Sequence, residues 1–409
     1  MTGRVYLDYN ATTPLAPEVA ASMVPYLDKA YGNPSSLHWS GLPARDAIEK
    51  ARSQVAALLC CDPTEIIFTS GGTEANNHAI KGLFFSSLAV KKPFHVITSQ
   101  IEHPAVLEPC RFIEGLGAEV TRLPVDQFAL VDPHDVAKAI RPHTALISIM
   151  HANNEVGTMQ PITEIAQIAR EHGVLCHTDA AQTVGKVPTD VESLGVDLLS
   201  VAGHKLYGPK GVGALFIREG VTIEPLLHGA DHEAGRRAGT ENVLEVVGLG
   251  AACELARDWI DDDPVQALRD ELWDRLQKMF GHRVTLNGHP EHRLPNTLNV
   301  SFSGLHGHEL LAHLPYLAAS TGSACHAGTM QISPVLAAMG VETAVAAGAI
   351  RFSLGRGSTK TEIKSVVESF GRLIDRPPYG NEQSFNGLRL ADTFSLHRGN
   401  DSKTLRSDR

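Results

Sequence analysis

The feature that most constrains the fold is an alternation of apolar runs and helical patterns through the first two thirds of the chain. The apolar runs predict strands over 95–98, 145–150, 175–177 and 198–201. Helical patterns separate them over 104–116, 132–140 and 162–172. Because strands joined through helices pair in parallel with right-handed crossovers, this order predicts an α/β fold with a mostly parallel sheet.

The pattern changes after about Asn242, where a long helical stretch runs to Ala256 and an acidic break follows at 261–264. Strand patterns over 283–286 and 297–302 then begin a smaller α+β region. The predicted division is a large domain over 14–255, a small domain formed by 1–13 and 256–375, and a polar, disordered tail over 376–409.

The composition excludes several classes of protein. With 409 residues, 43% hydrophobic and 20% charged, the chain is ordinary for a globular protein with a large core. The net charge of −10 argues against nucleic-acid binding. No apolar run reaches the ~18 residues of a membrane helix, and no charged-then-apolar leader is visible. Six unevenly spaced cysteines fit a reducing compartment, so we expect a cytoplasmic protein that binds no membrane.

One lysine lies in a glycine-rich turn between two apolar runs. The segment AGHKLYGPKG at 202–211 places Lys205 after the run 196–201 and before the run 212–217. Glycines let a ligand approach the backbone, and a partly buried lysine can lose its proton and form a Schiff base with a carbonyl. Pyridoxal phosphate is a cofactor that works in this way. On this peptide alone, a surface lysine in a turn remains the alternative.

Two further segments favour the cofactor. VLCHTDAAQ at 174–182 predicts a buried strand that ends in polar side chains. Asp179 can keep the cofactor's ring nitrogen protonated, and Gln182 can donate to its ring hydroxyl. TSGGTEANN at 69–77 places glycines and a threonine at a helix start, which forms a nest of donors for a phosphate. Taken alone, Asp179 could equally cap the next helix.

The sequence resembles the cysteine desulfurase and selenocysteine lyase family of fold-type-I pyridoxal phosphate enzymes, from Tyr6 to about Asp375. The motifs are LDYNATTP (7–14), YGNPSS (31–36), TSGGTEANN (69–77), EHPA (102–105), ANNEVG (152–157), HTDAAQ (177–182), GHKLYGPKG (203–211), RRAGTEN (236–242), TGSACHAG (321–328) and RFSLGR (351–356). The resemblance implies a seven-stranded type of sheet in the large domain, a smaller α+β domain and a homodimer.

The resemblance also implies how the chain would hold the cofactor ring. Lys205 would be the Schiff-base lysine, Asp179 the partner of the ring nitrogen and Gln182 that of the hydroxyl. His103 would stack on the ring.

The cofactor's phosphate would be held by Gly72, Thr73 and His204, and by Thr240 of the neighbouring subunit. The sequence departs from the family at Ala202, where a serine often provides a further phosphate ligand. Selenocysteine lyases are similar to this chain in having an apolar residue there. The departure removes one phosphate ligand, so we expect it to weaken cofactor binding more than it alters the chemistry.

The substrate carboxylate would be bound by Asn154 and Arg351, with Arg351 as the bidentate partner. Cys325 lies in STGSACHAG at 320–328, which is small and polar on both sides, with His326 beside it to favour the thiolate. A cysteine in an apolar or helical context is more often a small buried hydrophobe, which is what we expect of Cys60, Cys110, Cys176 and Cys253.

Together these residues predict a cysteine desulfurase that converts L-cysteine to L-alanine. Lys205 would move the α-proton, His103 would assist as an acid or base, and Cys325 would keep the sulfur as a persulfide. An acceptor or scaffold protein would then receive it for iron–sulfur cluster or thio-cofactor supply. The alternatives are a selenocysteine lyase, an aminotransferase or lyase that does not use the thiol, and a non-catalytic dimeric partner. We expect no metal, because no cysteines accompany the clustered histidines of 289–292 and 306–313.

Overall fold

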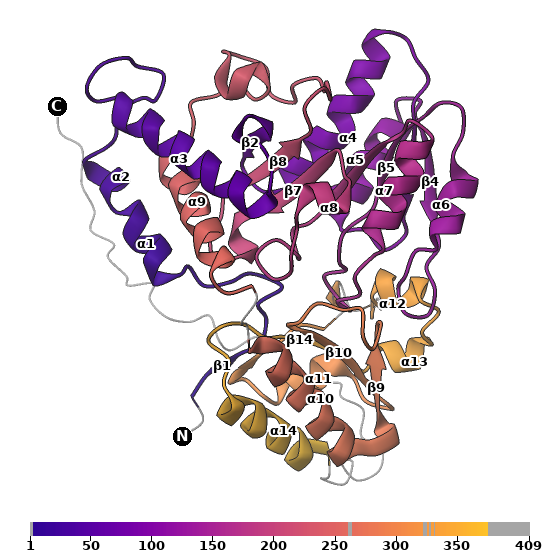
Figure 1. Cartoon of the computed structure of the whole chain (residues 1–409). Coiled ribbons are helices and arrows are strands. Elements are labelled where there is room, and N and C mark those ends of the chain that lie inside the picture. Colours follow the sequence, from indigo (N-terminus) through magenta and orange to yellow (C-terminus); the bar gives the residue numbers. More distant parts are fainter. Residues whose placement is uncertain (1–2, 261–263, 322–324, 327–328, 331, 375–409) are drawn as a thin grey trace, which may run out of the picture. The chain divides into compact units, whose positions relative to one another are not determined.

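A seven-stranded sheet forms the centre of the fold, in the order β2-β8-β7-β6-β5-β3-β4 (Figure 1). Its strands are β2 (Ile66–Thr69), β3 (His95–Ser99), β4 (Glu119–Leu123), β5 (Thr144–Ser148), β6 (Leu175–Asp179), β7 (Leu198–Ala202) and β8 (Gly213–Ile217). Neighbours from β7 to β4 pair in parallel, and β8 runs antiparallel to both β7 and β2. The predicted α/β fold with a mostly parallel sheet is confirmed.

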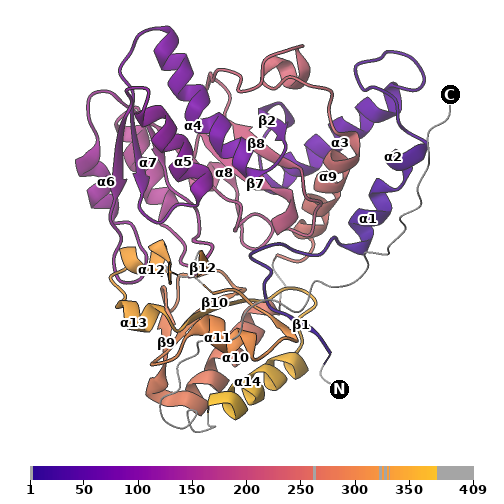
Figure 2. The same ribbon diagram turned by 180° about the vertical axis from the view of Figure 1, so that it is seen from behind.

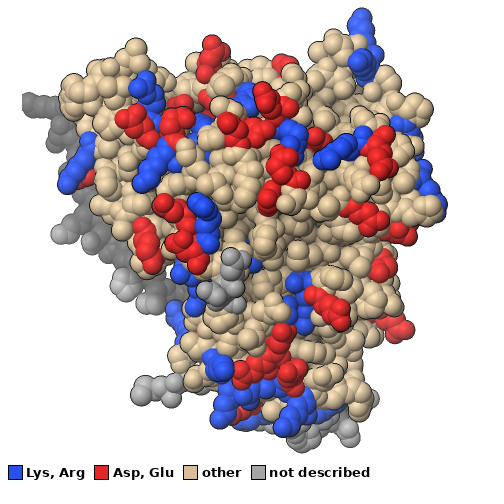
Figure 3. Space-filling view, in the orientation of Figure 1, with Lys and Arg blue, Asp and Glu red and all other residues tan. Residues whose placement is uncertain are grey.

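The computed structural model describes residues 3–260, 264–321, 325–326, 329–330 and 332–374, with the backbone alone at 325–326 and 329–330. The described residues up to Leu373 belong to one compact unit. The predicted disordered tail over 376–409 lies outside the described residues. Among the described helices, none is both long and apolar enough to cross a bilayer. Basic and acidic side chains are interspersed over the face shown in Figure 3.

Alternate residues of the strands pack on opposite faces of the sheet. In β8, Ala214 and Phe216 belong to one apolar core, whereas Leu215 and Ile217 belong to the other. Both faces are therefore buried, which explains why these strands have nearly continuous apolar sequences.

Helices cover both faces, as the two opposite views show (Figures 1 and 2). One core includes residues of α1 (Pro17–Met23), α3 (Leu42–Leu59), α6 (Pro133–Ala139), α7 (Ile162–Glu171), α8 (Val191–Leu194) and α9 (Val243–Arg257). The other includes residues of α4 (Gly72–Ala89) and α5 (Pro104–Glu114). The predicted helices at 104–116, 132–140 and 162–172 thus correspond to α5, α6 and α7. In α7, Ile162, Ile165 and Ala169 recur at helical spacing on its buried side.

A second, three-stranded antiparallel sheet has the order β14-β10-β9. It consists of β9 (Val284–Asn287), β10 (Thr297–Phe302) and β14 (Ala349–Ser353), and it contacts α10 (Val265–Phe280) and α14 (Lys360–Ile374). The rings of Phe302 and Phe370 stack here, with their centroids 5.2 Å apart. The strands predicted over 283–286 and 297–302 correspond to β9 and β10.

Short elements complete the described chain. They are α2 (Pro25–Asp28), α11 (Gly307–Ala312), α12 (Pro334–Ala338), α13 (Thr343–Ala346), β1 (Val5–Tyr6), β11 (Leu317–Ala318), β12 (Cys325–His326), β13 (Thr329–Met330), and the 3-10 turns η1 (Pro63–Glu65), η2 (Gly203–Lys205), η3 (His232–Gly235) and η4 (Gly281–Arg283). The strand β1 pairs in parallel with β11, so the amino-terminal segment lies beside residues more than 300 positions later.

The direction of the strands determines where their following loops meet. Because β8 is antiparallel to both of its neighbours, β2 runs in the same direction as β7. The loops after β2, β3, β5, β6 and β7 therefore leave the same edge of the sheet, where open α/β sheets bind ligands.

Buried His177 predicts a pH-dependent stability. Its ring nitrogens contact the hydroxyls of Ser148 at 2.8 Å and Ser200 at 3.0 Å, and burial lowers its pKa to about 3. The unfolded chain takes up a proton here near pH 6.5, whereas the folded chain does not. The free energy of unfolding therefore falls as the pH falls below about 6.5, by about 2 kcal/mol from this residue between pH 7 and pH 5.

The free energy of unfolding can be measured with urea at pH 7 and at pH 5. Between these pH values it should fall by about 2 kcal/mol less in His177→Gln than in the wild type. Exposed His172 provides the control, since His172→Gln should leave the difference unchanged. Equal pH dependence in His177→Gln and the wild type would contradict the assignment.

Candidate active site

A cavity of about 320 Å³ lies at the carboxyl ends of the parallel strands. Its lining includes these residues predicted from the sequence: Gly72, Thr73, His103, Asn154, Asp179, Gln182, His204, Lys205 and Arg351. Most come from loops that leave the large sheet, whereas Arg351 comes from β14 of the smaller one. A larger hollow of about 780 Å³ beside α6 and α7 is lined by other residues, including Asp126, Asp132 and Glu164.

Lys205 lies in η2, directly after β7. Its Nζ donates to the carbonyl oxygens of Asn10 at 2.6 Å and Ala11 at 2.9 Å. Burial, and next the positive charge of Arg351, lower the pKa of Lys205 to about 8. About a tenth of this amine is thus uncharged at pH 7, far more than for a lysine with an ordinary pKa, and only the uncharged amine attacks a carbonyl.

Asp179 ends β6 and is only 6% exposed. Its Oδ2 accepts from Nδ2 of Asn76 at 2.7 Å, and its Oδ1 accepts from the backbone N–H of Ala181 at 2.9 Å. The next helix, α8, begins only at Val191, so Asp179 does not cap it. Sequence reasoning missed Asn76, although it lies one helical turn after Gly72 in a motif already quoted.

The start of α4 provides backbone donors next to the cavity. Gly71 precedes the helix with φ of +145°, a conformation that favours glycine, and no side chain caps the helix. A Cβ at Gly72 would lie 3.2 Å from Cβ of Ala202, so a side chain there would crowd the cavity wall. Together with the hydroxyl of Thr73, these N–H groups can bind an anion.

His204 lies on the same side of the cavity. One ring nitrogen, Nδ1, contacts Oγ1 of Thr12 at 3.2 Å. Burial, followed by the charge of Lys205, lowers the pKa of His204 to about 4, so the ring is neutral. An adjoining hollow of about 430 Å³ is lined by Thr73 and His204 and also by Lys210, which sequence reasoning did not single out.

His103 precedes α5 and caps it, since its Nδ1 accepts from the backbone N–H of Ala105 at 3.1 Å. This bond leaves Nε2 to carry the proton of the neutral ring. Burial lowers the pKa of His103, which favours that neutral form.

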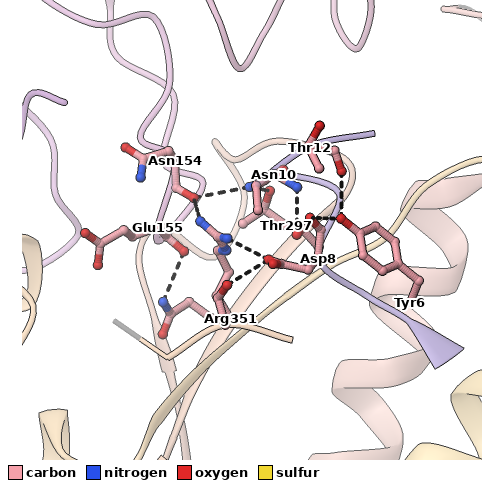
Figure 4. A network of polar contacts seen from close by, with 12 residues as sticks. Tyr6, Asp8, Asn10, Thr12, Asn154, Glu155, Thr297 and Arg351 are labelled. Atoms are coloured by element: carbon pink, nitrogen blue, oxygen red, sulfur yellow. Dashed lines mark hydrogen bonds and ion pairs between the residues drawn. The ribbon is translucent and has the colours of Figure 1, made fainter. Parts of the chain in front are cut away.

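Arg351 is held by acceptors from two distant segments (Figure 4). Its Nη1 donates to the backbone oxygen of Asn154 at 2.8 Å, and its Nη2 to Oδ1 of Asp8 at 2.7 Å. Its Nε is buried without a hydrogen-bond partner among the described residues. An arginine with a buried, unpaired N–H at a cavity wall fits a carboxylate ligand.

Asn10 connects the two sheets at this site (Figure 4). Its Nδ2 donates to Oγ1 of Thr297 at 2.8 Å, and its backbone oxygen accepts from Lys205 and from Nε2 of Gln182. Neither Asn10 nor Asp8 was predicted as a site residue, although both lie in the motif LDYNATTP. Their partners are more than 140 positions away, which no local pattern reveals.

Thr240 does not line this cavity and is exposed. Two ion pairs anchor the segment before it: Arg52 with Glu233 at 2.8 Å, and Arg237 with Glu74 at 2.9 Å.

Cys325 lies in β12, whose backbone pairs with β13. Its side chain, like that of His326, lies outside the described residues. Among the other cysteines, Cys110, Cys176 and Cys253 are buried as expected, and burial raises the pKa of Cys110 and Cys253 to about 12. They do not provide a thiolate at neutral pH. The expectation was wrong for Cys60, which is exposed because it lies just past the end of α3.

The residues at the cavity fit pyridoxal phosphate. One cavity contains an amine of lowered pKa, a buried carboxylate and a helix start with unpaired backbone donors. These groups match, in turn, the carbonyl, the pyridinium nitrogen and the phosphate of this one small molecule.

Comparisons with known proteins agree with this fit. Residues 5–366 match the family model described as aminotransferase class-V. The chain is 49% identical to a cysteine desulfurase IscS of Dictyoglomus turgidum, over 94% of this chain and 99% of the relative. It is 48% identical to a cysteine desulfurase IscS of Methanosarcina thermophila, over 91% of this chain and 92% of the relative.

Solved structures agree as well. A NifS-like protein superposes with a TM-score of 0.85 at 38% identity, over 91% of this chain and 99% of the other. SspA in complex with cysteine superposes with a TM-score of 0.76 at 39% identity, over 86% of this chain and 98% of the other. The chain therefore belongs to the class-V aminotransferases, which are fold-type-I pyridoxal phosphate enzymes, and within them to the family of the cysteine desulfurases.

Proposed function

We propose that this chain is a pyridoxal phosphate-dependent cysteine desulfurase, which forms L-alanine from L-cysteine and keeps the sulfur as a persulfide on Cys325. The observation that carries the proposal is the convergence of Lys205, Asp179 and Arg351 on one cavity of about 320 Å³. The names of the relatives and the cysteine complex of SspA support cysteine as the substrate.

Bound pyridoxal phosphate supplies a positively charged ring that withdraws the electron pair released when the α-proton leaves the substrate. Asp179 would hold the ring nitrogen in its protonated form, because its buried carboxylate lines the cavity. Gln182 would donate to the ring hydroxyl, and His103 would stack on the ring. The phosphate would be bound by Gly72, Thr73 and His204.

Arg351 and Asn154 bind the substrate carboxylate and so orient its α-carbon toward Lys205. The neutral Nζ of Lys205 takes the α-proton and returns it, which its lowered pKa allows near neutral pH. Lys205 and Arg351 approach the cavity from different sheets, so they hold the reacting carbon from two sides.

The sulfur step requires no external oxidant. The thiolate of Cys325 attacks the substrate sulfur, so an S–S bond forms as the Cβ–S bond breaks. The electron pair of that broken bond stays on the carbon skeleton, which takes a proton and leaves as alanine. Sulfur is oxidised and the β-carbon is reduced in equal measure. His103, neutral with a proton on Nε2, assists as acid or base.

A homodimer and a sulfur-accepting protein complete the proposal. Thr240 is exposed and lies away from its own cavity, which suits a contact with the phosphate of a second subunit. Leu37 and Trp39 are 79% and 81% exposed, as apolar residues of an interface would be in a single chain. The division into a large domain over 14–255 and a small domain of 1–13 and 256–375, and a cytoplasmic location, remain predictions.

The substrate can be tested directly. The purified enzyme with bound cofactor should form alanine from L-cysteine, and alanine formed from L-cysteine and from L-selenocysteine should be quantified side by side. A strong preference for selenocysteine would favour a lyase and contradict the proposal.

Cys325→Ser should bind cofactor as the wild type does but form alanine from cysteine at least about 100-fold more slowly, because the nucleophile for sulfur is lost. Cys60→Ser, at an exposed cysteine, is the matched control and should remain fully active. Undiminished turnover in Cys325→Ser would favour a lyase that does not use the thiol.

The lowered pKa of Lys205 predicts how the cofactor enters. When the apoprotein is mixed with pyridoxal phosphate, the rate at which the visible absorbance appears should rise with pH and level off above about 8, since only the neutral amine attacks the aldehyde. Lys205→Ala should give no such absorbance. A rate that keeps rising to pH 10, as it does for a simple alkylamine, would show that Lys205 has an ordinary pKa.

A further inference from the structure

Lys186 lies behind the cavity, in the loop that follows β6. Its Nζ donates to Oε1 of Gln182 at 2.9 Å and to Oδ1 of Asn10 at 3.3 Å. Gln182 and Asn10 both line the cavity, whereas Lys186 is partly buried one layer further back. It therefore contacts the site through other residues.

The contacts of Lys186 determine which way the amide of Gln182 points. An ammonium group has only donors, so it requires the oxygen of the amide. At the other end of the same amide, Nε2 donates to the backbone oxygen of Asn10 at 3.0 Å. Gln182 is thus held at both ends, and the second hydrogen of its NH₂ group remains for a ligand in the cavity.

The charge around Lys186 is unbalanced. Its two acceptors are neutral amide oxygens, and burial together with the charges of Lys205 and Arg351 lowers its pKa to about 7. With Lys186 protonated, this end of the cavity favours an oxygen that carries negative charge, such as an ionised ring hydroxyl.

We propose that Lys186 is a positioning residue that fixes the amide of Gln182 so that its N–H meets the ring hydroxyl of pyridoxal phosphate. The inference rests on the proposed cofactor. It assigns Lys186 no contact with the substrate, because Lys205 and not Lys186 lines the cavity.

The test compares two ligands that differ only in the ring hydroxyl. Dissociation constants are measured on apoprotein for pyridoxal phosphate and for 3-deoxypyridoxal phosphate. Lys186→Met should weaken binding of pyridoxal phosphate about tenfold and that of the deoxy compound less than about twofold, because the lost bond involves the hydroxyl alone. Lys138→Met, at a lysine 62% exposed on α6, removes the same charge far from the site and should change neither constant.

Lys186→Gln is the second variant, since its amide retains a donor for Gln182 without the charge. It should show a smaller loss than Lys186→Met, again confined to the ligand with the hydroxyl. Equal weakening of both ligands would indicate a merely structural role, and unchanged binding would show that Gln182 needs no support. Either result overturns the inference. A wild-type protein that fails to bind pyridoxal phosphate would refute the proposed function instead.

Discussion

The geometry of the site depends on the hydrogen bonds of Asn10. Its backbone oxygen accepts from Lys205 and Gln182, which follow strands of the large sheet. Its side chain bonds Thr297 of the smaller sheet. The separation between the amine of Lys205 and the guanidinium of Arg351 is therefore set by a residue that belongs to neither sheet. Strand direction brings the loops to one edge, and this short amino-terminal segment fixes how they face one another.

Burial favours the neutral forms of the basic groups of the cavity. It lowers the pKa of Lys205 to about 8 and that of His204 to about 4, and it also lowers the pKa of His103. Asp179 is buried as well, but its carboxylate accepts two hydrogen bonds, which compensate for lost water. The same surroundings thus ease the loss of a proton from Lys205, as proton transfer at a carbon requires, while hydrogen bonds satisfy the oxygens of Asp179.

Much of this arrangement could be predicted from the sequence. Strand and helix periodicity indicated the parallel sheet, and motifs identified Lys205, Asp179 and Arg351, because each lies in a short segment with its own chemical pattern. Asn10 and Asp8 were missed because their partners lie elsewhere: Asn10 with Thr297 and Asp8 with Arg351 are separated by 287 and 343 positions. Lys186 was missed because it lies behind the cavity and contacts it through Gln182, four positions earlier, and through the distant Asn10. The predicted contributions of Thr240 and Cys325 need a second subunit and a side chain outside the described residues.

The pairing of Asp8 with Arg351 changes what substrate affinity means here. A carboxylate that binds Arg351 meets a guanidinium that already has a carboxylate at 2.7 Å, so two anions would share the five N–H donors of one cation. The affinity would then be lower than that of a single ion pair, because the charge of Arg351 is partly neutralised by Asp8. Asp8 also accepts from the hydroxyl of Ser320 at 2.8 Å, and the backbone of Ser320 pairs with that of Arg351. Occupancy of the carboxylate site is thereby linked to the residue five positions before Cys325.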